Sequence, residues 1–384
     1  MIFFEIIAVI MFVVGIYAFI TTMTNIIYFS IMNRTDSIAD CDNGPKVSII
    51  IPARNEEHNL GRLLDSLVKQ TYHNIEILVI NDQSTDNTQA VIDRFRKKDK
   101  RVISYMSNPD VKLTKNGKIN ALLQLIPHAT GDYLLMTDAD CAHATHAVEH
   151  TLNMMLKHRL SIISGFPTEL CESYWGSVSM AAMLFANVLV PQAILHKLQL
   201  SALTFAIGQF IMVRKDDYDS VGGYGSLGSN VVCDDMSIVR LFVKNKKKYG
   251  FVNLSEDVAC YMYHERKEAF RGIERSVVGV FPVKPMTVIL LIPLVAALIL
   301  MAISPFISIA GLFFIPFENP YAVSLFLGWF MLYTAWFCGS RNINYRKLIS
   351  MSCPLTLLVL CWLYIHGVYR RLSGKNFIWK GRVI

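Results

Sequence analysis

Two aspartates separated by one small residue, Asp138 and Asp140, follow an apolar run in the stretch "LLMTDADCAH". Carboxylates at this spacing can hold a cation, or they can cap the helix that we expect after residue 143. A D-x-D pattern alone does not decide between the two roles, because Asp is common in turns and at helix caps. A second acidic pair, Asp234 and Asp235, opens the amphipathic stretch "DDMSIVRLFVKN", where it can supply a base or begin a helix.

Further polar side chains come directly after other predicted strands. "PARNEE" follows one β-branched run and "INDQSTDNT" follows the next. These stretches place Arg54, Glu56 and Asp82 at the carboxyl ends of predicted strands. Asp138 and Asp140 lie at the carboxyl end of another. In parallel sheets ligands bind at the carboxyl ends of the strands, so the sequence predicts a site there.

Apolar strand patterns alternate with helical patterns over the middle of the chain. This alternation predicts an α/β fold with a mostly parallel sheet and helical crossovers. The expected strands are 47–52, 75–80, 102–105, 132–136 and 161–165, and the expected helices include 60–67, 89–98, 118–126 and 234–245.

The composition predicts that part of the chain lies in lipid. Hydrophobic residues make up 53% and charged residues 17%, and the excess is concentrated at the two ends. Residues 1–31 carry a single charge, Glu5, and are long enough to cross a bilayer at about 20 residues per crossing. A cleaved signal peptide would have a basic start and a small-residue cleavage site, so an uncleaved anchor is expected.

Apolar segments return in residues 286–370, which are expected to span the membrane or to re-enter it. The first of these segments contains Pro293 and Pro305. It is either one long kinked helix or a helix followed by a re-entrant turn. The Lys/Arg clusters that flank these segments would all be cytoplasmic by the positive-inside rule. Three simple crossings do not satisfy that rule, so the number of spans and the side of the C-terminus stay open. Residues 174–200, interrupted by Pro191, are expected to lie in the interface.

The net charge of +7 includes the basic runs 94–101 and 244–250. These are solvated ends of surface helices or sites of attraction to anionic headgroups. No aromatic interleaving accompanies them, so no nucleic-acid partner is expected. The eight cysteines form no C-x-x-C pair, which argues against a zinc site or a disulfide framework and suits a reducing cytoplasm.

As a set, "PARNEE", "INDQSTDNT", "GKINALL", "TDAD" and "CDDM" resemble, in order and spacing, the inverting nucleotide-sugar-dependent glycosyltransferases of family 2. The resemblance covers roughly residues 46–265 and implies a GT-A fold, a nucleotide-sugar-binding α/β domain. We therefore expect a catalytic domain over 44–270, between the anchor at 1–31 and the segments at 286–370. Residues 371–384 form a basic tail.

The resemblance also implies roles for individual residues. Asp138 would bind the ribose and, with Asp140, a divalent cation (Mg²⁺ or Mn²⁺) on the diphosphate of a UDP- or GDP-sugar. Such hard cations prefer carboxylate and phosphate oxygens, so Cys141 is expected only to pack. Asp235 matches the catalytic base, and Asp234 stands where the family has Glu. The nucleotide pocket would be lined by Pro52, Ala53, Arg54, Glu56 and Asp82.

Three further positions are expected near the reaction. Lys118 adds a point charge to the phosphates or the sugar, or is a solvated lysine at a helix end. Gly208 and Gln209 lie in "IGQFIMVRKDDYDSVGGY", which is similar to the family's acceptor-side strand and turn.

The chain departs from the processive, polymer-forming members of the family. Their Q-x-x-R-W motif is missing from "FRGIERSVVG", which keeps Arg271 and Arg275, and Arg275 is predicted to contact the nucleotide sugar. The ending "NFIWKGRVI" resembles that of members that decorate carotenoids, hopanoids or ceramides. Trp379 would lie at the membrane interface and Arg382 would reach a phosphate, or the tail only holds the last helix at the surface.

We therefore expect an integral protein of a bacterial inner membrane with its catalytic domain in the cytoplasm. It would transfer one sugar to a lipid-like acceptor with inversion. The alternatives are a polysaccharide synthase or exporter, and a non-catalytic nucleotide-sugar-binding envelope protein. The sequence does not identify the sugar, the nucleotide, the acceptor lipid or the oligomeric state.

Overall fold

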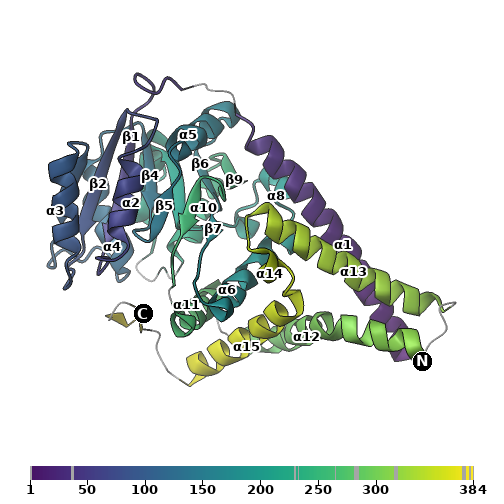
Figure 1. Cartoon of the computed structure of the whole chain (residues 1–384). Helices are drawn as coiled ribbons and strands as arrows, with labels where there is room; N and C mark the ends of the chain where they lie inside the picture. The colour runs from purple at the N-terminus through teal and green to yellow at the C-terminus, as the bar shows by residue number, and fades with distance from the viewer. Residues whose placement is uncertain are drawn as a thin grey trace. The chain divides into compact units, whose positions relative to one another are not determined.

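The computed structural model describes residues 2–35, 39–228, 231, 233–263, 265–280, 285–314, 319–373, 378–379 and 382–383. The chain forms two compact units. The sheet unit comprises residues 29–170, 194–262 and 378–384, and the helical unit comprises 1–28, 171–193 and 263–377. Figure 1 labels their elements, and each unit is described separately below.

The sheet unit is built on a seven-stranded sheet with strand order β3-β2-β1-β4-β8-β6-β9. Neighbouring strands are parallel except at β8, which runs antiparallel to both β4 and β6. The strands are β1 (Val47–Ala53), β2 (Ile75–Asn81), β3 (Val102–Met106), β4 (Tyr133–Thr137), β6 (Ile162–Phe166), β8 (Phe210–Arg214) and β9 (Tyr249–Asn253).

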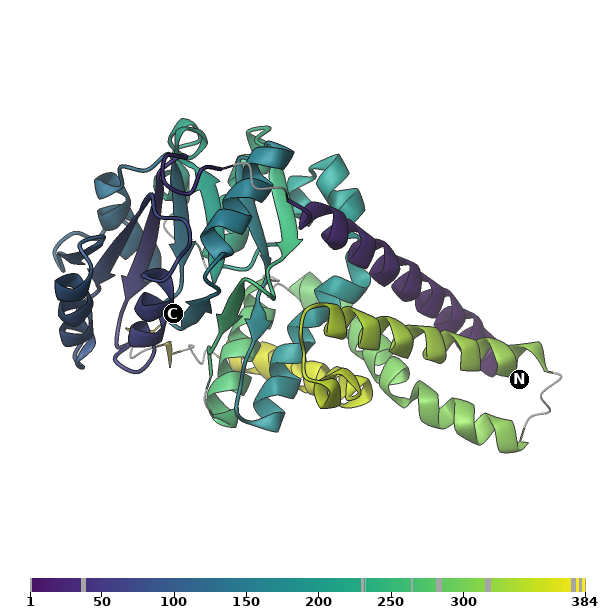
Figure 2. The same ribbon diagram turned by 45° about the horizontal axis from the view of Figure 1, so that its top comes forward.

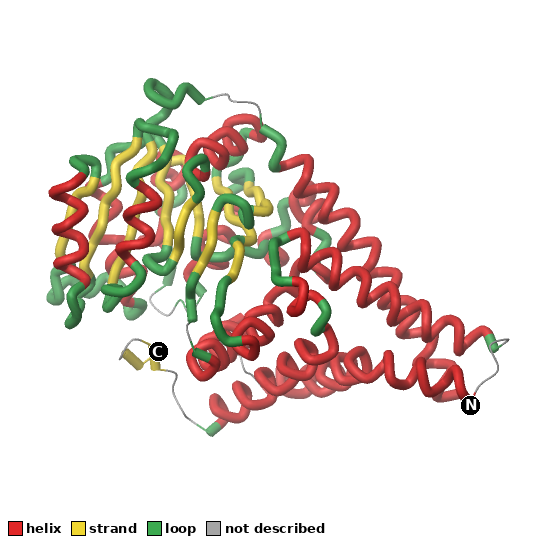
Figure 3. Tube along the Cα trace, viewed as in Figure 1, coloured by secondary structure: helices red, strands yellow, loops and turns green. Residues whose placement is uncertain are grey.

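Apolar and β-branched residues explain why these strands form the interior. Every residue of β2, β4 and β6 is buried, as a parallel sheet covered on both faces requires. In α2, Leu60, Leu63, Leu64 and Leu67 recur at helical spacing and are all buried. Figure 3 shows the strands as a layer with helices packed against it. The helices are α2 (Leu60–Leu67), α3 (Thr88–Lys98), α4 (Gly117–Leu125), α5 (Ala147–His158), α9 (Lys215–Ser220) and α10 (Asp234–Lys244), with the 3₁₀ turns η1 (Ile126–His128), η3 (Ser201–Leu203) and η4 (Gly223–Ser226).

The reversed direction of β8 brings its beginning to the carboxyl end of β4. Thr137, the last residue of β4, is opposite Phe210, the first residue of β8. The Thr137 hydroxyl donates a hydrogen bond to the Gln209 carbonyl at 3.0 Å. The residues just before β8 therefore lie beside those just after β4, although the two segments are far apart in sequence.

A second sheet of three short strands has the order β5-β10-β7. Cys260 of β10 is opposite Cys141 of β5 on one side and Glu169 of β7 on the other. Residues 141–143 were expected to lead directly into a helix, but they form β5, and α5 begins at Ala147. The strands are β5 (Cys141–His143), β7 (Thr168–Glu169) and β10 (Val258–Cys260), and the hairpin of β11 (Ile378–Trp379) and β12 (Arg382–Val383) also belongs to this unit.

In the helical unit every element that the structure describes is a helix. Among the residues that the structure describes, three helices are long and apolar enough to cross a membrane, at Phe4–Met32, Pro320–Asn342 and Cys353–Leu372. A continuous α12 contains both Pro293 and Pro305. The unit contains most of α1 (Ile2–Met32), with α6 (Tyr174–Ala181), η2 (Ala182–Leu184), α7 (Phe185–Leu189), α11 (Arg266–Val280), α12 (Pro285–Phe314), α13 (Pro320–Asn342), α14 (Lys347–Ser350) and α15 (Cys353–Leu372); α8 (Gln192–Leu198) begins in it.

Two glycines allow α1 and α13 to pack closely, and the two helices run side by side in Figure 2. A Cβ atom on Gly15 would overlap the carbonyl oxygen of Gly328, so no other residue fits at this position. Small residues at such crossings let the helix backbones approach, as is common between membrane helices.

Candidate active site

The predicted nucleotide-binding residues gather where β1 and β2 end. The backbone N–H of Asp82 donates to the Ala53 carbonyl at 2.7 Å, and the Arg54 guanidinium donates to the Asp82 carbonyl at 2.7 Å. The Asp82 carboxylate is buried and accepts a hydrogen bond of 3.1 Å from the Ser107 hydroxyl. The aspartate is therefore held in one orientation at this edge of the sheet, where Pro52 and Ala53 at the end of β1 are opposite Ile80 and Asn81 of β2.

Glu56 is fixed in the loop after β1. Its backbone N–H donates to the Thr88 hydroxyl at 2.8 Å, and its carboxylate accepts a hydrogen bond of 3.0 Å from the Asn59 amide. Glu56 is 8% exposed. The structure thus places it beside the first residue of α3, at the same edge of the sheet as Asp82.

Lys118 links the two acidic motifs. Its ammonium lies 2.6 Å from Asp138 Oδ1 and 3.5 Å from Asp234 Oδ2. Burial alone would lower the pKa of Lys118, but the charges of Asp138 and Asp234 outweigh it and hold that pKa well above its usual value. The lysine is thus a fixed positive charge and not the solvated helix-end residue that was the alternative expectation.

Lys118 is placed by the first turn of α4. The Asn116 side chain caps that helix by accepting a hydrogen bond of 3.2 Å from the Ile119 N–H. The Asn116 amide also donates to the Val231 carbonyl at 3.4 Å, which ties the cap to the segment before α10. The sequence "NGKIN" thus sets the start of the helix and the position of the lysine together.

Asp235 lies at the N-terminus of α10 with both carboxylate oxygens engaged. Its Oδ2 accepts from the Gly208 N–H at 3.1 Å, and its Oδ1 accepts from the Met236 N–H at 2.7 Å. Burial, and then the negative charge of Asp234, raise the pKa of Asp235 to about 7. A carboxylate with this pKa can accept a proton near neutral pH.

Gly208 lies against Asp235 and Lys118. A Cβ atom at this position would lie 3.2 Å from Asp235 Cβ and 3.5 Å from the Lys118 ammonium. Tyr224 of η4 is buried nearby, within electrostatic range of Asp234 and Lys118. The start of β8, the start of α10 and η4 therefore converge on Lys118.

Glu169 is a residue of this region that the sequence did not indicate. Burial raises its pKa to about 8, the nearby side-chain amide of Gln209 opposes this shift, and the charges of Asp140 and Asp138 add to it. Glu169 lies next to the predicted acceptor residue Gln209, and at neutral pH its carboxyl group is mostly protonated. No motif signals it, because only the pairing of β7 with β10 brings it to the D-x-D motif.

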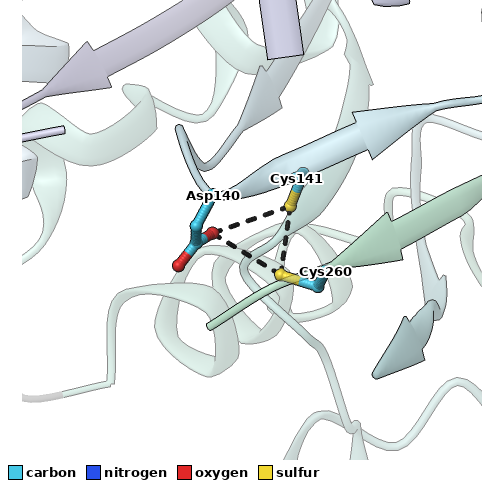
Figure 4. Close-up of side chains that lie close together, drawn as sticks. All are labelled: Asp140, Cys141 and Cys260. Atoms are coloured by element: carbon cyan, nitrogen blue, oxygen red, sulfur yellow. Dashed lines mark hydrogen bonds between the residues drawn. The ribbon is translucent and has the colours of Figure 1, made fainter. Parts of the chain in front are cut away.

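Asp140 lies beside two thiols, as Figure 4 shows. The sulfur atoms of Cys141 and Cys260 are 3.2 Å apart, and both lie within 3.8 Å of Asp140 Oδ1. Burial raises the pKa of Cys141 to about 11 and holds that of Cys260 well above its usual value, so both thiols stay protonated at neutral pH. Cys141 is therefore a buried residue with a packing role, in agreement with the expectation. Cys260 is a neighbour that the sequence did not indicate.

The donor atoms of the D-x-D motif fit a hard divalent cation. Carboxylate oxygens of Asp138 and Asp140 are at the same strand end, and the second carboxylate oxygen of Asp140 points away from both sulfur atoms in Figure 4. Mg²⁺ and Mn²⁺ prefer oxygen ligands, and protonated thiols do not compete for them. Asp138 and Asp140 can thus hold such a cation with the phosphates of a nucleotide supplying further oxygens.

For three predicted site residues the described structure does not test the predicted role. Arg275 is in α11 of the helical unit. Trp379 and Arg382 are paired with each other across the β11–β12 hairpin, and their side chains are outside the described part of the chain. Their roles stay predictions.

Comparison with known proteins identifies the sheet unit. Residues 48–222, which contain both strand-end motifs and the D-x-D motif, match the family Glycosyl transferase family 2. The chain carries a family 2 glycosyltransferase domain. This result confirms the predicted family, the enzyme class and the use of nucleotide sugars, and the sheet topology and end helices confirm the predicted fold class.

Relatives extend the match beyond this domain. A 4,4'-diaponeurosporenoate glycosyltransferase of Staphylococcus aureus is 24% identical over 350 residues, covering 88% of each chain. A UDP-Glc:alpha-D-GlcNAc-diphosphoundecaprenol beta-1,3-glucosyltransferase of Escherichia coli is 34% identical over 119 residues, covering 31% of this chain and 44% of that protein. A mannosyltransferase of Pyrobaculum calidifontis, solved with GDP-Man and Mn²⁺, has a TM-score of 0.50 at 15% identity, with 97% and 100% of the chains covered, and supports the fold.

Proposed function

We propose that this glycosyltransferase transfers a single sugar, with inversion, from a nucleotide sugar to a hydroxyl group of a lipid-like acceptor, with Asp235 as the base. The observation that carries the proposal is the environment of Asp235. Its half-buried carboxylate has a pKa of about 7 and is fixed by two backbone N–H groups, next to the Lys118–Asp138 ion pair.

The reaction follows from these positions. The acceptor oxygen forms a bond to the anomeric carbon while the bond from that carbon to the diphosphate breaks. The hydroxyl proton passes to Asp235, and the bonding electron pair leaves with the nucleoside diphosphate. A hydroxyl is a weak nucleophile until a base removes its proton, and a positioned base typically contributes about 10²- to 10⁴-fold in rate.

On the donor side, negative charge grows on the departing diphosphate. Asp138 and Asp140 would hold a divalent cation, whose positive charge stabilises that leaving group. Lys118 has a proton at all relevant pH values and adds a fixed charge beside Asp138. Asp82, with Pro52, Ala53, Arg54 and Glu56, would bind the nucleoside. The Pyrobaculum neighbour holds GDP-Man with Mn²⁺ and the Escherichia relative is named for UDP-Glc, which supports a GDP- or UDP-sugar.

A lipid-like acceptor is supported by the helices and by the relatives. In the described part of the chain three helices are long and apolar enough to span a membrane, and an acceptor dissolved in the bilayer needs an enzyme held there. The Staphylococcus relative, matched over most of both chains, is named for a diaponeurosporenoate. All eight cysteines are free, which supports a catalytic domain on the cytoplasmic side.

The same relative favours a second candidate, a carboxylate acceptor. A carboxylate is already ionised at neutral pH and needs no base. The ionised form of Asp235 would repel such an acceptor, so the environment of Asp235 favours the hydroxyl. The two candidates differ in their dependence on Asp235.

The experiment is a transfer assay on the detergent-purified full chain with UDP- and GDP-sugars, Mn²⁺ or a chelator, and a total lipid extract. A glycosylated lipid that forms only with the metal, and whose new bond has the anomeric configuration opposite to that of the donor, is the expected result. A product with retained configuration, or transfer only to water-soluble saccharides, would contradict the proposal.

A further inference from the structure

The helical unit contains a cavity of about 630 Å³ that the catalytic proposal does not use. It is formed within this unit by α6, α11 and α15, and its lining combines aromatic and aliphatic side chains with positive charges. We propose that this cavity binds an anionic phospholipid of the bilayer, with the phosphate at its basic end and a hydrocarbon chain along its aromatic wall.

The apolar wall has the right chemistry for a hydrocarbon chain. Trp175 of α6, Phe270 of α11 and Trp362 of α15 line the cavity, together with Leu358. The rings of Phe270 and Trp362 meet edge to face at 5.5 Å. Trp175, Leu358 and Trp362 are each more than 40% exposed. These large apolar side chains face an open cavity instead of a protein core, and contiguous exposed surface of this kind marks a binding site.

The charged lining has the right chemistry for an anion. Arg266, Lys267 and Arg271 of α11 and Arg370 of α15 contribute four positive charges, against the single carboxylate of Glu274. The three basic residues of α11 are exposed and form no ion pair with another residue that the structure describes. Guanidinium groups bind phosphate oxygens in a two-pronged geometry, so these arginines suit a phosphate group. The excess of positive charge favours an anionic headgroup over a zwitterionic one.

Glu274 organises the basic end of the cavity. It is 2% exposed, and its carboxylate lies 3.0 Å from His366 Nδ1 and 3.9 Å from the Arg370 guanidinium. The His366 ring stacks on Trp362 with ring centres 4.8 Å apart and an angle of 8°. The Glu274 carboxylate thus orients His366 and Arg370 at the end of the apolar wall that is nearest to Trp362.

The polarity of α15 matches the orientation of a lipid in one leaflet. Leu358, Trp362, His366 and Arg370 recur every four residues and so lie along one side of the helix. Leu358 is in the apolar first half of a helix that can cross a membrane, and Arg370 is in its last turn. At 1.5 Å per residue the stripe is about 18 Å long, enough for a phosphate at one end and several carbons of an acyl chain.

The test uses tryptophan fluorescence of the full chain, because two of its five tryptophans line the cavity. Brominated phosphatidylglycerol and brominated phosphatidylcholine are titrated into the detergent-purified protein. We expect stronger quenching at lower concentration by phosphatidylglycerol. Trp175→Phe with Trp362→Phe should remove the difference between the lipids, whereas Trp329→Phe, outside the cavity lining, should keep it.

Charge variants test the headgroup site. Arg271→Gln and Arg370→Gln should each weaken phosphatidylglycerol quenching about tenfold, the loss of one charge-assisted hydrogen bond. Arg371→Gln is the matched control, because Arg371 is the exposed neighbour of Arg370 and does not line the cavity. If Arg370→Gln loses its fold through Glu274, the exposed Arg271 still decides the question.

Three results would overturn the proposal: equal quenching by the two lipids, an effect of Arg371→Gln as large as that of Arg271→Gln, or displacement of the lipid by millimolar inorganic phosphate. The last result would mean that the site takes a free anion. None of these measurements depends on turnover, so this inference stands or fails separately from the proposed transfer reaction.

Discussion

The backbone N–H of Gly208 donates a hydrogen bond of 3.1 Å to Asp235 Oδ2. Gly208 precedes a strand that runs antiparallel to its neighbours, and Asp235 is in the first turn of a helix. The contact joins the predicted acceptor side of the site to the proposed base. It also explains why position 208 has no side chain.

Gly208→Ala should reduce transfer without unfolding the protein. The new Cβ would lie 3.2 Å from Asp235 Cβ, so Asp235 must shift by a few tenths of an ångström, whereas the Lys118 ammonium, at 3.5 Å, would be in ordinary contact. Such a displacement of a base is expected to lower kcat/KM roughly tenfold or more. Gly228→Ala is the control, since nothing described lies within 4 Å of that position. Equal rates for the two variants would show that Gly208 is not at the reacting centre.

The pH profile should report Asp235. The base acts in its ionised form, so kcat/KM should fall as the pH drops through its pKa of about 7. The positive charge of Lys118 opposes the upward shift of that pKa, so Lys118→Gln should move the acid limb of the profile to higher pH. Lys115→Gln, an exposed lysine of the preceding loop, should leave it unchanged. If the acid limb of the profile does not move in Lys118→Gln, that limb does not report the ionisation of Asp235.

Glu169→Gln should be nearly silent at pH 7. The pKa of Glu169 is raised to about 8, so its carboxyl group is mostly neutral at pH 7, and an amide of the same shape replaces it. Rates of the two proteins are expected to agree within about twofold at pH 7 and to diverge above pH 8, where only the wild type ionises. A loss of tenfold or more at pH 7 would mean that Glu169 acts as a charged carboxylate.

The metal should depend on Asp140 and not on the adjacent thiols. Asp140→Asn is expected to weaken Mn²⁺-dependent nucleotide binding, measured by calorimetry, by about tenfold or more. Cys260→Ala should leave it unchanged, because the thiol is protonated and a hard cation prefers oxygen. The opposite pattern, with loss of binding only in Cys260→Ala, would assign the sulfur atoms to the metal site.

Local patterns were sufficient to predict the residues that follow the long strands. The runs that became β1, β2 and β4 carry continuous apolar or β-branched residues, and the rule that ligands bind at the carboxyl ends of parallel strands then led to Asp82, Asp138 and Asp140. The capping residue Asn116 and the Leu spacing of α2 similarly give their helices a local signal.

The short sheet was beyond this reasoning. Strands of two or three residues have no measurable periodicity, so nothing local indicated β5, β7 or β10. Glu169 and Cys260 come to the D-x-D motif only through the pairing of those strands. The ionisation of Glu169 and Asp235 was equally hidden, because it depends on burial and on neighbouring charges that the chain order does not show.

The central claim is the role of Asp235, and Asp235→Asn tests it most directly. The variant keeps the shape of the side chain and removes its ability to accept a proton. Transfer should fall by about 10²- to 10⁴-fold while the Kd of the nucleotide sugar, measured on the same preparation, stays within about twofold. Asp219→Asn, on the exposed side of α9, should behave as wild type in both measurements. Wild-type transfer by Asp235→Asn would contradict the account and would favour an acceptor that needs no base.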